Sequence, residues 1–238
     1  MAYKSKTWME FLKKSKEMFD NSNIKITDNH DKEIIFIEPI DTTIMCEYVI
    51  KNAMYFLHDG WNLTIMHGMK NEKHFQDITK NLGKIKLINL GNDGFYPHPF
   101  EYNNFLISKK SYDMIEKDIF VIIQLDVIIL KKIPDLYLNY SYVGAPWAIN
   151  YGVSCGNGGF SLRNKKDMLK IIDKFNWRGE NEDRWFSIGC KLLNLNLCPK
   201  DLASLFSSET IFNIDSCGIH KPHFGEDKLK LMFNNVKW

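Results

Sequence analysis

Short apolar segments alternate with helical patterns through the first half of this chain, and this alternation restricts the fold more than any other feature. Buried strands are predicted at 34–37, 62–67, 84–89 and 120–124, with helices at 42–57, 71–80 and 103–117. Strands that alternate with helices form a mainly parallel sheet, because each helix carries the chain back along one face of the sheet. The sequence therefore predicts an α/β, Rossmann-like fold, with a mixed, mainly parallel sheet flanked by helices.

The second half of the chain and its N-terminal segment depart from this alternation. In the second half we expect a short strand or corner at 142–147, a loop at 156–159, helices near 164–175 and 181–195, and a late strand at 206–214. Near the start, apolar side chains from Trp8 to Phe19 recur at helical spacing, with lysines opposite. We expect residues 1–31 to form an amphipathic helix and linker, and 32–238 a single domain. The helix could dock on that domain, contact a membrane surface or serve a homodimer.

Composition limits the cellular setting more than the chemistry. The 238 residues suffice for one sizeable core, and a net charge of +2 gives no reason to expect a nucleic-acid partner. The five cysteines are odd in number and form no CxxC pair, which indicates reduced, buried thiols in an intracellular protein. The sequence shows neither a secretory apolar region nor a membrane-length apolar run, so we expect a cytoplasmic protein without a membrane span.

A single carboxylate interrupts the most apolar stretch of the sequence. Asp126 follows the apolar residues 119–123 and precedes another apolar run at 127–130. A carboxylate in such surroundings is costly unless it is paired, hydrogen-bonded or bound to a metal. The ends of strands in α/β sheets are also where these folds bind ligands. Asp126 is therefore a candidate ligand or metal site, or else a buried cap for the turn that follows.

Three later motifs contain residues that could carry chemistry. The glycine-rich segment 156–163 would let the backbone approach a ligand closely, or would simply form a tight turn. Glu182 and Asp183 begin a predicted helix, where negative charge is favoured; alternatively, one acid is a general base and the other holds substrate hydroxyls. His220 and His223 flank a proline, and His220 could be a metal ligand or a structural histidine.

In this order, the motifs resemble those of the small GT-A-fold nucleotide-sugar glycosyltransferases in which Gln-x-Asp replaces the usual Asp-x-Asp. The matching segments are Q-x-D at 124–126, G-N-G-G-F-S-L-R at 156–163, E-D at 182–183, F-S-S-E at 206–209 and G-x-H-K-P at 218–222. The resemblance covers about residues 33–224. The family is largely uncharacterised and includes members from large DNA viruses. It implies a GT-A-like fold and a role in glycan biosynthesis.

The resemblance also implies a role for each matching residue. Asp126 and His220 would bind Mn or Mg at the donor diphosphate, Asp183 would be the general base, and Glu182 would assist it. The donor is expected to be a UDP-sugar. Its nucleoside would be held by Glu38, Tyr102, Asn103 and Ser108, and Gln124 would bind the ribose or a metal-bound water. The sugar and acceptor site would be lined by Gly158, Gly159 and Ser161 and braced by Arg163. His223 stands where a tryptophan is common, and it could add a ligand or remove an aromatic wall.

The expected activity is transfer of a sugar from a nucleotide-sugar donor to a glycan or protein hydroxyl, with metal assistance and inversion. Two alternatives stay open from the sequence. A relative that binds nucleotide sugars or glycans without turnover would keep the same motifs. A metal-dependent phosphoester hydrolase would need more acids and histidines to converge on the metal.

Overall fold

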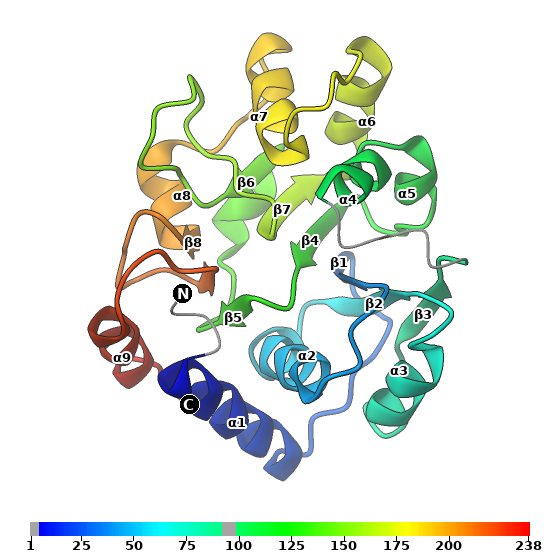
Figure 1. Ribbon diagram of the computed structural model, residues 1–238, viewed down its shortest axis with the longest axis vertical. Helices are drawn as coiled ribbons and strands as arrows, with labels where there is room; N and C mark the ends of the chain where they lie inside the picture. The colour runs from blue at the N-terminus through cyan, green and yellow to red at the C-terminus, as the bar shows by residue number, and fades with distance from the viewer. Residues whose placement is uncertain (1–4, 92–98) are drawn as a thin grey trace.

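A six-stranded sheet forms the centre of the protein, a computed structural model that describes residues 5–91 and 99–238 (Figure 1). In spatial order its strands are β3 (Lys86–Asn89), β2 (Asn62–His67), β1 (Lys32–Glu38), β4 (Ile119–Ile123), β7 (Phe160–Asn164) and β6 (Tyr142–Gly144). The pairs β3–β2, β2–β1 and β1–β4 are parallel, whereas β7 is antiparallel to both β4 and β6. The expected mixed, mainly parallel α/β sheet is confirmed.

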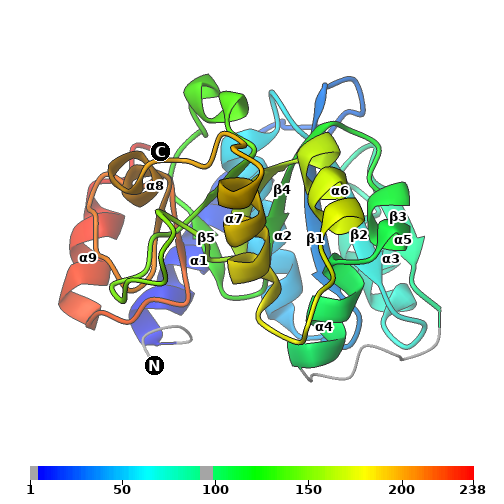
Figure 2. The same cartoon turned by 90° about the horizontal axis from the view of Figure 1, so that it is seen from above.

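Helices cover both faces of this sheet. On one side lie α2 (Ile44–Leu57) and α3 (Glu72–Thr79), and on the other α4 (Pro99–Leu106), α5 (Lys109–Asp113), α6 (Lys165–Lys174) and α7 (Glu182–Leu192) (Figures 1 and 2). The chain first builds outward from β1 to β3 and then returns to place β4 on the other side of β1. This reversal is a topological switch point, and α/β folds bind ligands at the carboxyl edge of such a point.

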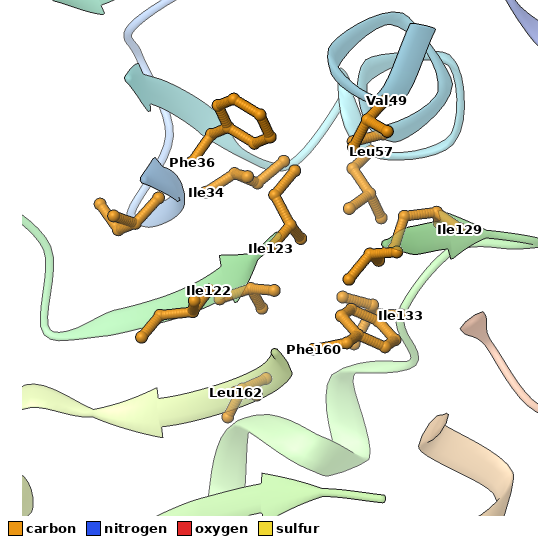
Figure 3. Close-up of a cluster of buried hydrophobic side chains, with 14 of the residues drawn as sticks. Ile34, Phe36, Val49, Leu57, Ile122, Ile123, Ile129, Ile133, Phe160 and Leu162 are labelled. Carbon is orange, nitrogen blue, oxygen red and sulfur yellow. The ribbon is translucent and has the colours of Figure 1, made fainter. Parts of the chain in front are cut away.

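A second, three-stranded sheet adjoins the first. It consists of β5 (Val127–Ile129), β9 (Gly218–His220) and β8 (Ser207–Ser208), in that spatial order. Because β5 follows β4 after only three residues, the segment 124–126 is the junction between the two sheets. Phe36, Ile123, Ile129 and Phe160 meet at this junction and form part of one continuous core (Figure 3). Full burial of each such side chain contributes roughly 1.5–3 kcal/mol, so the junction is held firmly.

The amphipathic N-terminal helix docks on the main body, which was one of the three arrangements considered from the sequence. Helix α1 (Lys6–Asn21) packs against α2 and against α9 (Glu226–Asn234), where the rings of Phe11 and Phe233 stack with centroids 4.1 Å apart. Lys51 of α2 also binds Asp20 at 2.7 Å. The apolar stripe of α1 is therefore covered by the protein's own elements.

Two predictions of secondary structure were wrong. The helix expected at 103–117 is split, because Ser108 ends one helix and caps the next: its Oγ accepts a hydrogen bond from the Ser111 N–H at 3.2 Å. The late strand expected at 206–214 is only the two-residue β8, preceded by α8 (Lys200–Phe206). A 3₁₀ helix, η1 (Asp135–Asn139), follows β5. All five cysteines are buried and free, as expected of reduced thiols.

The helices within residues 5–91 and 99–238 do not meet the requirements for crossing a bilayer, since none of them is both long enough and apolar enough.

Candidate active site

The pairing of the small sheet brings Asp126 and His220 together. Asp126 lies in the turn between β4 and β5, and the antiparallel register of β5 with β9 places Val127 opposite His220. The Lys221 N–H donates to the Asp126 carbonyl at 3.0 Å, which extends the ladder by one more bond. As a result, Nε2 of His220 stands 3.2 Å from Oδ1 of Asp126. Two residues almost a hundred positions apart thus form one charged pair at the carboxyl end of β4.

A second carboxylate completes a triad around the buried His220. Glu209 directly follows β8, which runs parallel to β9, and its Oε1 lies 3.6 Å from Nδ1 of His220. Burial would lower the pKa of His220, but the two carboxylates outweigh burial and raise that pKa to about 9. Burial would likewise raise the pKa of Asp126, yet His220 and Lys221 hold it below its usual value. The imidazole is therefore held between two anions.

The turn 156–159 connects this triad to the acids of α7. A Cβ atom on Gly159 would overlap Nε2 of His220 and would stand 2.6 Å from Oε1 of Gln124. A Cβ atom on Gly158 would overlap Oε1 of Glu182 and would stand 3.2 Å from the Cβ of Asp183. The glycines with positive φ lie elsewhere in the chain. Glycine is thus required here for close approach and not for an unusual backbone conformation.

Asp183 is the more accessible of the two acids on α7. Its Oδ2 accepts the Gly158 N–H at 3.2 Å, and its Oδ1 accepts the Arg184 N–H at 2.6 Å. Burial and the neighbouring charge of Glu182 raise the pKa of Asp183 to about 6, although these hydrogen bonds and Arg163 oppose the rise. A carboxylate with such a pKa is ionised at neutral pH and is still basic enough to accept a proton.

Glu182, by contrast, is engaged in a buried ion pair. Its two carboxylate oxygens accept from Nη1 and Nη2 of Arg163 at 2.9 and 3.0 Å, and the two side chains are 4% and 0% exposed. The Nε of Arg163 donates to Oγ of Ser161 at 3.0 Å, and that hydroxyl donates to the Gly158 carbonyl at 2.9 Å. The pair therefore supports the glycine turn from behind.

The residues expected to hold the donor fall into two groups. Tyr102 of α4 lies against Gln124, and burial raises the pKa of its phenol while Gln124 opposes the rise. Glu38 ends β1 beside His67 of β2, and its Oε1 accepts the N–H groups of Ile40 and Asp41, each at 2.9 Å. Burial raises the pKa of Glu38. Gln124 and Glu38 thus flank the switch point between β4 and β1.

Other expected residues lie farther from this centre or are used locally. Ser108 caps α5 and donates to the Phe105 carbonyl at 2.7 Å. Asn103 is half-buried on α4. His223 has an exposed side chain, and its backbone N–H donates to the Glu209 carbonyl at 3.1 Å. Within residues 5–91 and 99–238, the side chains of these three residues form no hydrogen bond or ion pair with the triad, and His223 meets it only through that backbone N–H.

The sequence did not predict that Glu209 takes part in the site. It belongs to the F-S-S-E segment, whose position in the order of motifs was noticed without a role for its acid. The acid immediately follows two small residues in a buried strand, which was the only local signal. Its contact with His220 depends on the pairing of β8 with β9, and pairing between distant segments cannot be read from either segment alone.

Comparison with solved structures defines the class of fold. The galactosyltransferase LgtC, solved with donor and acceptor sugar analogues, is 13% identical with a TM-score of 0.52, covering 87% of this chain and 96% of that one. The Pyrobaculum calidifontis mannosyltransferase PcManGT, solved with GDP-Man and Mn²⁺, is 6% identical with a TM-score of 0.52, covering 81% and 62%. Apo GlyE of Streptococcus pneumoniae TIGR4 is 14% identical with a TM-score of 0.52, covering 88% and 65%. The protein has a GT-A-like glycosyltransferase fold.

Within this class, the chain belongs to the family described as protein of unknown function DUF5672, whose model matches residues 84–220. That match extends from the segment before β3 to His220, so it includes the junction, the glycine turn and the acids of α7. A comparison with curated proteins finds no match.

Proposed function

We propose that this protein is a glycosyltransferase that moves a sugar from a nucleotide-sugar donor to an acceptor hydroxyl. One observation carries the proposal: the two consecutive glycines Gly158 and Gly159 lie against two different chemical groups. Asp183, with a pKa near 6, lies beside the first, and the pair Asp126–His220 lies beside the second. A proton acceptor and a cation-binding pair thus stand side by side at the switch point of a glycosyltransferase fold.

The residues at the junction fit a divalent metal. A carboxylate and an imidazole are ligands that Mn²⁺ accepts, and Asp126 and His220 would hold the ion between them. The observed separation of Oδ1 and Nε2 is 3.2 Å. In the described part of the chain, no group of three or more His, Cys, Asp or Glu side chains could hold a metal. Donor phosphates and water would therefore supply the remaining ligands.

The chain's own residues would then divide the reaction between them. When bound, the divalent cation would neutralise charge on the departing nucleoside diphosphate. Asp183 would take the proton from the acceptor hydroxyl as that oxygen attacks the anomeric carbon. By analogy with inverting glycosidases, in which the base acts on the face of the sugar away from the leaving group, we propose that transfer proceeds with inversion.

The remaining residues would bind and orient the donor. Tyr102, Gln124 and Glu38 line the carboxyl edge of the switch point, where we place the nucleoside and the sugar. Glu182 has both oxygens engaged by Arg163, so we assign it a positioning role through Gly158 and Asp183. This positioning role differs from the role considered from the sequence, in which the second acid would hold substrate hydroxyls.

Donor binding provides the first test. The protein would be incubated with UDP-, GDP- and dTDP-sugars and Mn²⁺, and thermal shift and donor hydrolysis would be followed. We expect a UDP-sugar to raise the midpoint of unfolding only when metal is present, and we expect Asp126→Ala to abolish the shift. Failure of every donor with every metal, together with wild-type behaviour of Asp126→Ala, would refute the proposal. Donor binding without transfer to any acceptor would instead favour a non-catalytic relative.

The pH dependence tests the assignment of the base. Asp183 is active as the carboxylate, so kcat/KM should rise about tenfold per pH unit below 6 and level off above it. Asp183→Asn should lower the rate of transfer by about 10²–10⁴-fold while donor affinity stays close to that of the wild type. If Asp183→Asn kept the wild-type rate and the same fall in kcat/KM below pH 6, Asp183 would not be the base.

A further inference from the structure

An exposed aromatic cluster lies beside Asp183 and takes no part in the proposed donor site. Trp147 and Tyr151, on the loop between β6 and β7, meet edge to face with ring centroids 5.1 Å apart. Cζ of Arg184 lies 5.2 Å from the centroid of the Tyr151 ring. We call Trp147, Tyr151 and Arg184 the aromatic wall.

The loop that carries the wall is held in place along its length. It runs out beside α7 and α8 (Figure 1). Nζ of Lys191, on α7, donates to the Gly152 carbonyl at 2.9 Å. On the other side, the Ala148 N–H donates to Oγ1 of Thr210 at 3.0 Å. A loop fixed on two sides presents its rings in one arrangement before any ligand arrives, which lowers the cost of binding.

The wall adjoins the proposed base from two directions. The Trp147 ring covers Gly156 so closely that a Cβ atom there would overlap it, and Gly156 is two residues before the Gly158 N–H that binds Asp183. On α7, Arg184 is the next residue after Asp183 and donates its own N–H to that carboxylate. The order along the turn is therefore aromatic wall, base and metal pair.

The surface chemistry of the wall suits a polar ligand with apolar faces. Tyr151 is 38% exposed and Trp147 is half-buried, so parts of both rings remain in contact with water. Among residues 5–91 and 99–238, no carboxylate lies within ion-pair distance of the Arg184 guanidinium. A saccharide ring presents C–H groups that pack on the negative face of an aromatic ring, and hydroxyls that accept from a guanidinium.

We propose that the aromatic wall binds the acceptor and that this acceptor is a saccharide. The inference rests on the proposed function, because it places the acceptor next to the proposed base. A peptide acceptor that bound by strand addition would need a free strand edge beside the base. Here the outer edge of β6 is already used: Tyr142 forms a bridge with Leu197, and the Cys198 N–H donates to the Tyr142 carbonyl at 3.1 Å.

A printed array carrying defined mono- and oligosaccharides beside Ser-, Thr- and Tyr-containing peptides tests this assignment. The protein is applied with UDP and Mn²⁺. We expect saccharide spots to bind, and Tyr151→Ala and Arg184→Met each to weaken that binding about tenfold. Ile149→Ala is the matched control, because Ile149 lies on the same loop and is 66% exposed but has neither an aromatic ring nor a charged group to offer a saccharide. It should bind as the wild type does.

Three results would overturn the assignment: binding to peptides but to no saccharide, binding to neither, or saccharide binding that both wall variants retain. A UDP-induced thermal shift in each variant shows that the fold and the donor site survive the substitution. Hydrolysis of UDP-sugars by the wild type, measured without any acceptor, tests the proposed function separately. Absent hydrolysis together with no metal-dependent binding of any UDP-sugar, with saccharide binding intact, would reject the transferase reaction while leaving a saccharide site at the wall.

Discussion

Two charged clusters lie on either side of the glycine turn, and they differ in how fully their charges are matched. Arg163 and Glu182 form a one-to-one pair, with two hydrogen bonds and side-chain exposures of 0% and 4%. In the second cluster, Asp126 and Glu209 share the single imidazole of His220. Asp126 also keeps 20% of its side chain exposed. The first cluster is balanced and closed, whereas the second has an excess carboxylate that faces outward.

The difference indicates which cluster can act on a ligand. A buried pair with every donor and acceptor engaged can bind nothing further without losing its own bonds, and it serves to specify the packing around it. An excess of negative charge at the edge of a fold can be compensated by a cation from solution. We therefore assign the first cluster to support of the turn and the second to metal and donor binding, and the following substitutions test that division.

The largest effect on stability is expected from breaking the balanced pair. Arg163→Met leaves the Glu182 carboxylate buried without its partner, which should lower the free energy of unfolding by about 3–5 kcal/mol. Urea unfolding, monitored by tryptophan fluorescence, measures the loss. Arg163→Met/Glu182→Leu should recover much of it, because the second substitution removes the unpaired charge.

An exposed pair supplies the control for this experiment. Lys166 on α6 binds Asp118 at 2.6 Å, and both side chains are more than half exposed. Lys166→Met should change the free energy of unfolding only slightly, because solvent screens such pairs. If Arg163→Met were no more harmful than Lys166→Met, the Arg163–Glu182 pair would not support the turn.

Removing the excess carboxylate should affect binding more than stability. Asp126→Asn keeps the size of the side chain and removes its charge, so Mn²⁺ affinity should fall by about 100-fold or more, since loss of even a supporting residue costs 10–100-fold. The free energy of unfolding should fall less than in Arg163→Met. Calorimetric titration with Mn²⁺ and urea unfolding measure the two quantities. A large loss of unfolding free energy in Asp126→Asn, with little change in Mn²⁺ affinity, would restore the interpretation of Asp126 as a buried cap.

The contrast between the clusters also shows what could be predicted from the sequence. The alternation of strands and helices follows from local hydrophobic periods, so the sheet and most helices were predicted within a few residues. Asp126 was found because an acid in an apolar segment is conspicuous without any knowledge of its neighbours. Glu182 and Asp183 were noticed as adjacent acids at a predicted helix start, and the family resemblance named Asp183 as the base, but the pKa of Asp183 depends on burial and on Glu182.

What could not be predicted depends on pairing between distant segments. The strand expected at 206–214 was wrong because β8 is a strand only through its two-residue pairing with β9. The same pairing places Glu209 beside His220. Ser108 illustrates a local competition that the hydrophobic pattern does not reveal, since its hydroxyl caps a helix where a continuous helix was expected.

The smallest effect is expected from Glu209, which we regard as a positioning residue for His220. Its Oε1 lies 3.6 Å from Nδ1, and this negative charge would favour a proton on Nδ1 and leave the Nε2 lone pair free to face the metal, as carboxylates commonly do for histidine ligands. Glu209→Gln should weaken Mn²⁺ binding by about tenfold and should change the ratio of the two His220 tautomers, which ¹⁵N NMR of the metal-bound protein can detect. His223→Ala is the control, because that side chain is exposed. If Glu209→Gln changed neither property while His223→Ala weakened Mn²⁺ binding, His223 would be a ligand, and the cluster would extend outward along the 220–223 segment instead of inward to Glu209.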